Sequence, residues 1–290
     1  MLFKADMHKE CESLIQQLMA SAKDGSLERA DGTKVPATDD DLKAFLAGDL
    51  CQMEIEHKKL YFDFLSLVGD VESWEEYQSG DTVKNDMKIF YKKGDGGRLM
   101  TYMDLMIDSS FINCMALWWE VDLMPTWSKE MKNPEFYANP SELSGGWRCK
   151  MAFPWPMSDR YMQVSLVSFV DRKTRGILNI MKDVPLDQKT WFGKEVPEFG
   201  KKKHRMNVIR GYDYIEKVSE TETRYIGIAE MDMNLSKITN DILNYLMKSM
   251  LYKQGVAFRE QAKKVPGSEY EKRIKDTRKD FYRKIEALVD

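Results

Sequence analysis

The sequence contains few cysteines and histidines, and those present are scattered. The four cysteines, Cys11, Cys51, Cys114 and Cys149, form no C-x-x-C pair and no disulfide framework, so reduced thiols in a cytosolic protein are the simpler interpretation. The three histidines lie far apart, and neither H-x-x-x-H nor G-x-S-x-G occurs. We therefore expect no metal site and no enzyme activity.

The chain also lacks a charge excess and a long apolar run. It has 44 basic and 47 acidic residues, whereas nucleic-acid binders carry a basic excess that neutralises phosphates. No stretch approaches the roughly eighteen apolar residues of a membrane span, and charged residues follow the first methionine too closely for a signal peptide. We expect a cytoplasmic protein that binds no nucleic acid and contacts membranes only peripherally, if it contacts them.

Methionine, in contrast, is abundant, at 20 of 290 residues. The remaining composition, 43% hydrophobic and 31% charged, is ordinary for a globular protein, and a chain of this length can bury a core large enough to contain a cavity. Because methionine is flexible and polarizable, its abundance fits either a loosely specified core or a pliable apolar pocket. The two interpretations overlap, and both stay open.

The first part of the chain shows helical periodicity. Apolar residues recur at helical spacing in residues 9–22, and a polar loop follows over 24–36. Thr38, with Asp41 three residues later, resembles a capping box for a helix that we expect to end near Leu67. We predict that residues 1–70 form a helical extension packed on the core.

From Trp74 onward the pattern favours strands, and Gly94 to Gly97 mark a hairpin turn rather than a phosphate loop. A helix is expected over 109–120, and irregular chain around Pro125, Pro134 and Pro140. A long loop is expected over 183–203, and amphipathic helices over 235–262 and after Ser268. Short connections predict an antiparallel sheet, and segregated helices an α+β fold in which a curved sheet and one long helix enclose a cavity. The expected strands are 83–92, 98–107, 147–153, 161–171, 176–182, 204–218 and 222–233.

Several motifs resemble a known family when taken together in order. They are FPWPMSDR at 153–160, EVDL at 120–123 followed by Trp127, Gly211-Tyr212, and Asp232 followed by Leu235-Ser236 and Leu243-Asn244. They resemble the steroidogenic acute regulatory protein-related lipid-transfer (START) domains, especially the plant and protist branch. The resemblance covers residues 74–258 and departs from the family at Tyr161, where an acid is usual. We therefore expect a START-like lipid-binding domain over 71–264, and an extra C-terminal helix over 265–290 that the resemblance does not cover.

The resemblance implies a helix-grip fold, with a curved antiparallel sheet around a long C-terminal helix. It also implies an internal tunnel for one sterol, phospholipid, sphingolipid or other apolar molecule, bound or transferred without a cofactor. A different hypothesis is a structural or interaction subunit that keeps this fold but fills the cavity with side chains. An enzyme of the related cyclase type is a third, and would need titratable groups that converge inside the cavity.

Candidate ligand-binding residues follow from strand alternation and from the family's inward positions. Each could equally be a plain core residue, because apolar faces usually are. Ser168, Arg210 and Glu230 are candidates for a polar head group, although Arg210 and Glu230 could instead be surface partners. Arg160 is more simply a structural anchor. The full set is Met162, Val164, Leu166, Ser168, Leu178, Ile180, Arg210, Ile228, Glu230, Leu243, Leu246, Met247, Met250 and Phe258.

Two surface features suggest partners. Aromatic residues at 191–192 and lysines at 201–203 could contact a membrane, or could form a solvated loop. The last helix has a narrow apolar seam that could dock on its own domain or on a protein partner.

Overall fold

The structure is a computed structural model that describes residues 26–28, 34–36, 49–77, 87–141, 143–155, 157–171, 173–191, 194–198 and 204–289. Side chains are described from residue 59 onward, except 140 and 141. The chain divides into two units, Met1–Leu65 and Ser66–Asp290. The helix expected over 9–22 lies outside the described residues.

The first unit contains two short strands and most of one helix. Strands β1 (Ser26–Glu28) and β2 (Lys34–Pro36) pair antiparallel where only a polar loop was expected. Helix α3 (Asp49–Asp70) corresponds to the helix predicted to end near Leu67. The prediction that residues 1–70 pack on the core stays a prediction.

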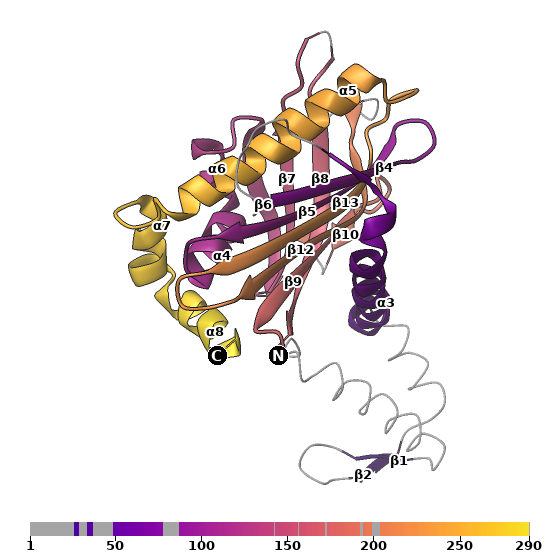
Figure 1. The fold of residues 1–290 in the computed structure, drawn as a ribbon. Coiled ribbons are helices and arrows are strands. Elements are labelled where there is room, and N and C mark those ends of the chain that lie inside the picture. Colours follow the sequence, from indigo (N-terminus) through magenta and orange to yellow (C-terminus); the bar gives the residue numbers. More distant parts are fainter. Residues whose placement is uncertain are drawn as a thin grey trace. The chain divides into compact units, whose positions relative to one another are not determined.

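The second unit is built on one nine-stranded antiparallel sheet, ordered β3-β4-β5-β13-β12-β9-β8-β7-β6. Figure 1 labels most of these strands and shows the closing helical segments across them. The hairpin connections of the sheet confirm the predicted antiparallel α+β architecture. Seven strands occur close to where alternation predicted them, and the short pair β10 (Thr190–Trp191) and β11 (Lys194–Glu195) interrupts the predicted long loop. The sheet strands are β3 (Glu75–Glu76), β4 (Met87–Lys93), β5 (Arg98–Ile107), β6 (Met131–Ser141), β7 (Ser144–Met151), β8 (Arg160–Asp171), β9 (Gly176–Asp183), β12 (Asn207–Lys217) and β13 (Thr223–Asp232).

Strand β6 corrects the expectation of irregular chain around the prolines. It lies at the edge of the sheet and pairs only with β7 there. Proline lacks an N–H donor, so it is tolerated at an edge but not inside a sheet. The pairing register shifts between Lys132 and Glu135, on either side of Pro134, and Asn133 has a φ of 49°. The prolines therefore bend the strand without preventing it.

Two helical segments connect β5 to β6. Helix α4 (Phe111–Trp119) begins where the Ser110 side chain accepts a hydrogen bond from the backbone N–H of Asn113, at 3.4 Å. A capping serine of this kind satisfies a donor that the first helical turn leaves unpaired. All but one residue of α4 is buried. A 3₁₀ segment, η2 (Val121–Thr126), follows directly.

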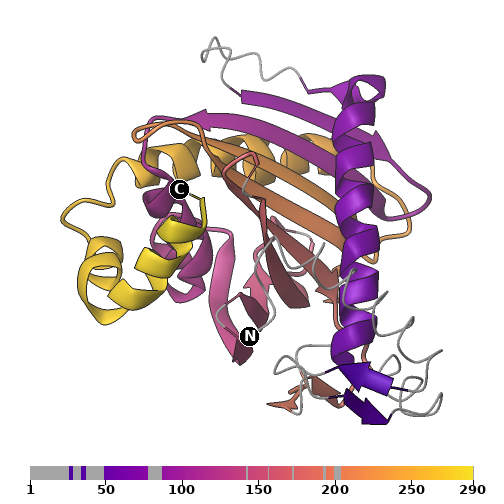
Figure 2. The same cartoon turned by 90° about the horizontal axis from the view of Figure 1, so that it is seen from below.

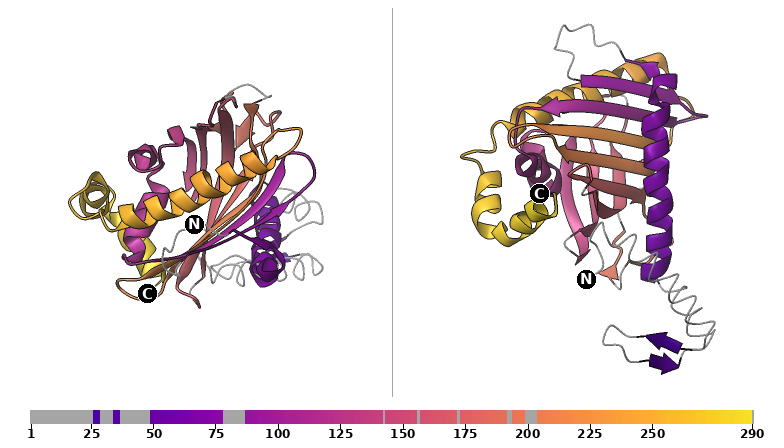
Figure 3. Two further views of the ribbon diagram at one scale, coloured as in Figure 1. Left: turned by 45° about the horizontal axis from the view of Figure 1, so that its top comes forward. Right: turned by 60° about the horizontal axis from the view of Figure 1, so that its bottom comes forward.

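The long C-terminal helix is continuous but not uniform. We call its three parts the closing helix: α5 (Asn240–Tyr245), the π-helical η4 (Leu246–Tyr252) and α6 (Lys253–Ala262). It begins at Asn240, five residues later than predicted, and the hydroxyl of the N-cap Thr239 accepts a hydrogen bond from the backbone N–H of Ile242. A Cβ at Gly255 would lie 2.8 Å from Met103 Sδ of β5, so glycine permits close contact with the sheet. The sheet curves around this helix (Figure 3).

Beyond the closing helix, the structure has three helical pieces rather than one. We call them the C-terminal segment: α7 (Glu269–Lys272), η5 (Arg273–Thr277) and α8 (Lys279–Val289). Arg278 interrupts the helix with a φ of −127°. Figure 2 shows these pieces beside α4, where the ring of Phe281 stacks on Trp119 at a centroid distance of 5.6 Å.

Candidate functional site

A cavity of about 240 Å³ lies between the sheet and the closing helix. Its walls come from seven strands of the sheet, from α4 and η2, and from the closing helix. Seven methionines and three tryptophans dominate it, so its surface is mainly apolar. The described lining residues are Met103, Trp118, Val121, Met124, Trp127, Ser128, Met131, Trp147, Met151, Met162, Leu166, Met181, Asp213, Tyr225, Met250, Gln254 and Phe258.

A buried carboxylate forms one polar point of this wall. Asp213 of β12 is 7% exposed, and its Oδ1 accepts a hydrogen bond from the hydroxyl of Tyr225 on the neighbouring strand. The side chain of Trp118 is a second hydrogen-bond partner. Burial raises the pKa of Asp213 to about 6, because a low-dielectric site disfavours the charged form. Burial and the nearby carboxylate also raise the pKa of Tyr225.

A second polar point lies where the closing helix passes η2 and β6. Gln254 donates from Nε2 to Ser128 Oγ at 2.9 Å and to Glu130 Oε2 at 2.7 Å. Both amide hydrogens of Gln254 therefore have protein acceptors. These two hydrogen bonds connect the closing helix to the segment that precedes β6.

Four of the predicted ligand-binding residues line the cavity: Met162, Leu166, Met250 and Phe258. Val164 and Ser168 lie on the same face of β8 but are not among the described lining residues. Ser168 instead donates from Oγ to Asn179 Oδ1 at 2.6 Å, both side chains being buried. That hydroxyl completes a polar contact between two strands rather than facing open space.

Three further predicted residues, all from the closing helix, belong to the packed core. Leu243, Leu246 and Met247 are 6%, 2% and 1% exposed. They are not among the described residues that line the cavity. Their burial holds the closing helix in place.

Leu178, Ile180 and Ile228 lie on the opposite face of the sheet. The register pairs Leu166 with Met181, and neighbouring Val167 with Ile180, so Met181 shares the cavity face with Leu166. Ile180 and Ile228 are both paired with Tyr212, on the other face. The alternation was assigned to the wrong phase because the cavity face of β9 carries the polar Asn179 and Asp183 beside Met181, so the more apolar set faces away from the cavity.

Arg210 and Glu230 also lie on the face away from the cavity, in register with each other between β12 and β13. Arg210 Nε lies 2.7 Å from Glu230 Oε2. They form a cross-strand ion pair, which is the surface alternative considered for them. The carboxylate that does face the cavity, Asp213, was missed. Its signal was a charged residue at the inward phase between two tyrosines, Tyr212 and Tyr214.

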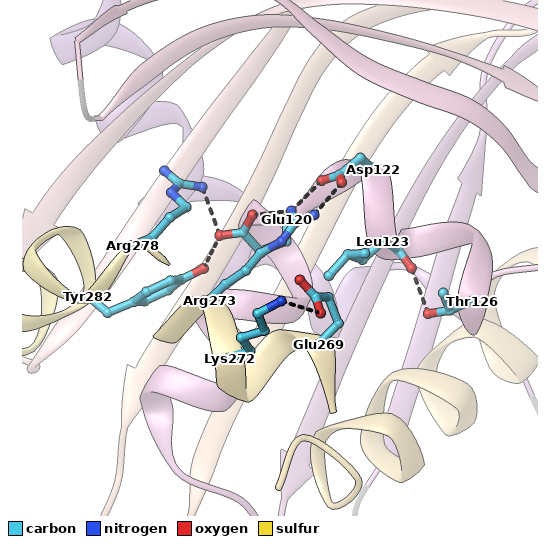
Figure 4. Close-up of polar contacts among 9 residues, drawn as sticks. All are labelled: Glu120, Asp122, Leu123, Thr126, Glu269, Lys272, Arg273, Arg278 and Tyr282. Carbon is cyan, nitrogen blue, oxygen red and sulfur yellow. Dashed lines mark hydrogen bonds and ion pairs between the residues drawn. The ribbon is translucent and has the colours of Figure 1, made fainter. Parts of the chain in front are cut away.

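The EVDL motif at 120–123 overlaps the start of η2. Its acidic side chains contact the C-terminal segment, whereas its Val121 side chain lines the cavity. Glu120 is 3% exposed, and Figure 4 shows its carboxylate held by residues of the C-terminal segment. Arg273 Nη1 and Arg278 Nη1 donate to it at 2.7 and 2.8 Å, and the Tyr282 hydroxyl donates at 2.5 Å. The Arg273 guanidinium also lowers the pKa of Asp122.

The apolar residues of the same motif line the cavity. Val121, Met124 and Trp127 are lining residues, and the indole N–H of Trp127 donates to Tyr270 Oη at 3.0 Å. The C-terminal segment therefore docks on its own domain, the first of the two alternatives considered for it. It supports one wall of the cavity from behind.

Arg160, in the FPWPMSDR motif, is a structural anchor, as the sequence indicated. It is 5% exposed, and it donates from Nε to the carbonyl of Met233 at 2.9 Å and from Nη1 to the carbonyl of Ser158. Met233 follows β13 and precedes the closing helix. The arginine thus joins the β7–β8 loop to the chain that enters that helix.

Membrane-spanning helices and metal-binding clusters are both absent from the residues that the structure describes. No helix among them is long and apolar enough to cross a membrane. They also hold no group of three or more histidine, cysteine or acidic side chains placed to bind a metal ion.

Comparison with known proteins places the fold. No family model and no curated protein sequence matches the chain. Among solved structures, human StAR-related lipid transfer protein 5 aligns with a TM-score of 0.57 at 10% identity, covering 72% of this chain and 95% of that one. Human STARD10 aligns with a TM-score of 0.56 at 10% identity, covering 86% and 87%. At such low identity the likeness shows the fold alone: this chain has the helix-grip fold of StAR-related lipid-transfer domains.

Proposed function

We propose that this protein binds one lipid, or a similar apolar small molecule, in the cavity beneath the closing helix. The observation that carries the proposal is the cavity itself, whose wall consists mainly of methionine and tryptophan side chains. An unfilled apolar cavity costs free energy, because its wall atoms lose dispersion contacts that a ligand restores. Flexible methionines can adapt their shape to such a ligand.

The size of the cavity favours a compact ligand. Pockets for drug-sized molecules span roughly 300–1,000 Å³, and the volume of about 240 Å³ falls just below that range. A ring system or a single chain fits this space better than a two-chain phospholipid does. We propose binding without catalysis, since the Asp213–Tyr225 and Gln254–Ser128 contacts engage the cavity's polar groups with one another.

Transfer between membranes is the second part of the proposal, and the β7–β8 loop is the contact we favour. Trp155 in this loop is 93% exposed, and tryptophan prefers the membrane–water interface. The loop lies beside the start of the closing helix, where Phe153 and Tyr245 have ring centroids 6.0 Å apart. Ligand exchange would require this loop or the helix to move. The other candidate patch, with Phe192 and residues 201–203, lies outside the described residues.

We also propose that the protein is cytoplasmic and peripheral at membranes. Cys114 and Cys149 are free, buried thiols, which suits a reducing compartment. Within the START family, the motif at 153–160 supports a place in the plant and protist branch.

The proposal is tested by native mass spectrometry of the purified protein, followed by organic extraction and lipid identification. We expect a one-to-one complex with an extractable apolar molecule. An unliganded mass, with no uptake from mixed liposomes, would contradict the proposal. It would favour the alternative that the fold serves as an interaction subunit.

A further inference from the structure

The described lining residues of the cavity include an acidic side chain but no basic one. Apart from tryptophan, four of its described lining residues have polar side chains: Ser128, Asp213, Tyr225 and Gln254. Asp213 is the one carboxylate among them, and none of the described lining residues is lysine, arginine or histidine. A ligand carboxylate or phosphate would therefore approach a fixed negative charge with no cation beside it.

Asp213 retains unused capacity as a hydrogen-bond acceptor. An ionised carboxylate accepts about four hydrogen bonds, and its partners here are Tyr225 and Trp118. Tyr225 donates to Asp213, and this orients the carboxylate within the cavity wall. The other polar point differs, because both amide hydrogens of Gln254 already bond to Ser128 and Glu130.

Burying a charge is costly unless it is well hydrogen-bonded, so a donor from the ligand would stabilise Asp213. This inference rests on the proposed function and specifies its ligand. We infer that the bound molecule carries a hydroxyl or amine on a compact apolar body and that this group donates a hydrogen bond to the Asp213 carboxylate. Asp213 thereby selects alcohols and amines over acids.

The test uses four probes that share one chain and differ in the head group: decanol, decylamine, decanoate and decane. Each displaces the neutral dye Nile red from the full-length protein after endogenous ligand is extracted. Hydrogen bonds to a charged group, and the absence of repulsion, predict that decanol and decylamine bind at least about tenfold more tightly than decanoate. Comparable affinities for all four head groups would overturn the inference while leaving the cavity proposal intact.

Two variants assign the preference to one residue. Asp213→Asn keeps the side-chain shape and removes the charge, so we expect the decylamine preference to fall about tenfold while decane affinity stays unchanged. Ser128→Ala, which changes the other polar point of the same cavity, should leave the order of the probes unaltered. An unchanged preference in D213N, or an equal loss in S128A, would contradict the role of Asp213.

The wild-type series needs no variant and decides the question even if D213N fails to fold. If neither Nile red nor decane binds the wild type, the cavity is closed to ligands. The proposed function then fails together with the inference. Binding of decane without selectivity among head groups removes the inference alone.

Discussion

Arg273 and Asp122 form a bidentate ion pair, with Nη1 2.7 Å from Oδ1 and Nη2 2.6 Å from Oδ2. The arginine belongs to the C-terminal segment, and the aspartate to η2. Asp122 directly follows Val121 in the cavity wall. Because the same guanidinium also bonds Glu120, one side chain ties the end of the chain to the motif that forms this wall.

Replacing Arg273 should therefore weaken the docking of the C-terminal segment. In Arg273→Ala, Glu120 keeps Arg278 and Tyr282 as partners, so we expect a loss of about 1–3 kcal/mol in the free energy of unfolding, measured in urea. Lys275→Ala is the control, because Lys275 is 71% exposed in its pair with Glu271 and should change stability by less than about 0.5 kcal/mol. Equal effects of the two variants would contradict the importance of the Glu120 contacts.

Met250 offers a direct test of the cavity. It is only half-buried on the closing helix, yet it lines the cavity, so an arginine there can reach solvent while its stem blocks the space. We expect Met250→Arg to reduce bound ligand by at least about tenfold, because the arginine stem occupies space that the ligand would fill. The measurement is ligand recovered per protein after purification.

Met250→Leu is the matched control, because a swap of similar volume is usually tolerated. It should retain ligand. Circular dichroism should show that both variants are folded. Ligand retained at the wild-type level in a folded M250R protein would exclude this cavity as the binding site.

Asp213 should also make the free energy of unfolding depend on pH. Burial raises its pKa from 3.8 to about 6, so between these values the folded protein holds a proton that the unfolded chain has released. The protonated folded state is favoured at low pH, and this contribution is lost as the pH rises through about 6. Relative to Asp213→Asn, wild-type stability should fall by roughly 2 kcal/mol between pH 4 and pH 6.

Urea unfolding of both proteins at several pH values measures this difference. Asp183, whose pKa is also raised to about 6 by burial, titrates in both proteins and cancels from the comparison. A difference that stays constant across the range would show that Asp213 does not change its protonation on folding.

The sequence predicted helices and strands correctly where the two faces of an element differ in polarity. The hairpin over β4 and β5, the strands β12 and β13, and the closing helix followed from periodicity and turn residues. Strand β6 did not, because proline is a reliable breaker only inside a sheet, and edge position is a property of the whole fold. The same holds for Arg210 and Glu230, whose face is fixed by register.

Met162 and Leu166, which were predicted to face inward, line the cavity, and so does Met181, which was not among the predicted residues. Strand β8 has a more apolar inward set, whereas the inward set of β9 includes the polar Asn179 and Asp183, so only the register with β8 reveals which residues of β9 face inward. The tryptophans of α4 and β7 were not among the predicted ligand-binding residues. Trp118 and Trp147 line the cavity because α4 and β7 come together there. This proximity depends on the tertiary structure, so the local sequence pattern cannot predict it.

Trp155 provides the last test, that of membrane contact. Its side chain is 93% exposed, so Trp155→Ala removes no packing and should leave stability and ligand affinity unchanged. Loss of an inserted tryptophan should weaken vesicle binding about tenfold and slow lipid transfer between vesicles to a similar degree. Val218→Ala is the control: Val218 is 44% exposed and follows β12 at the opposite end of the strands, near Gly176. Unchanged transfer in W155A, or an equal loss in V218A, would move the membrane contact away from the β7–β8 loop.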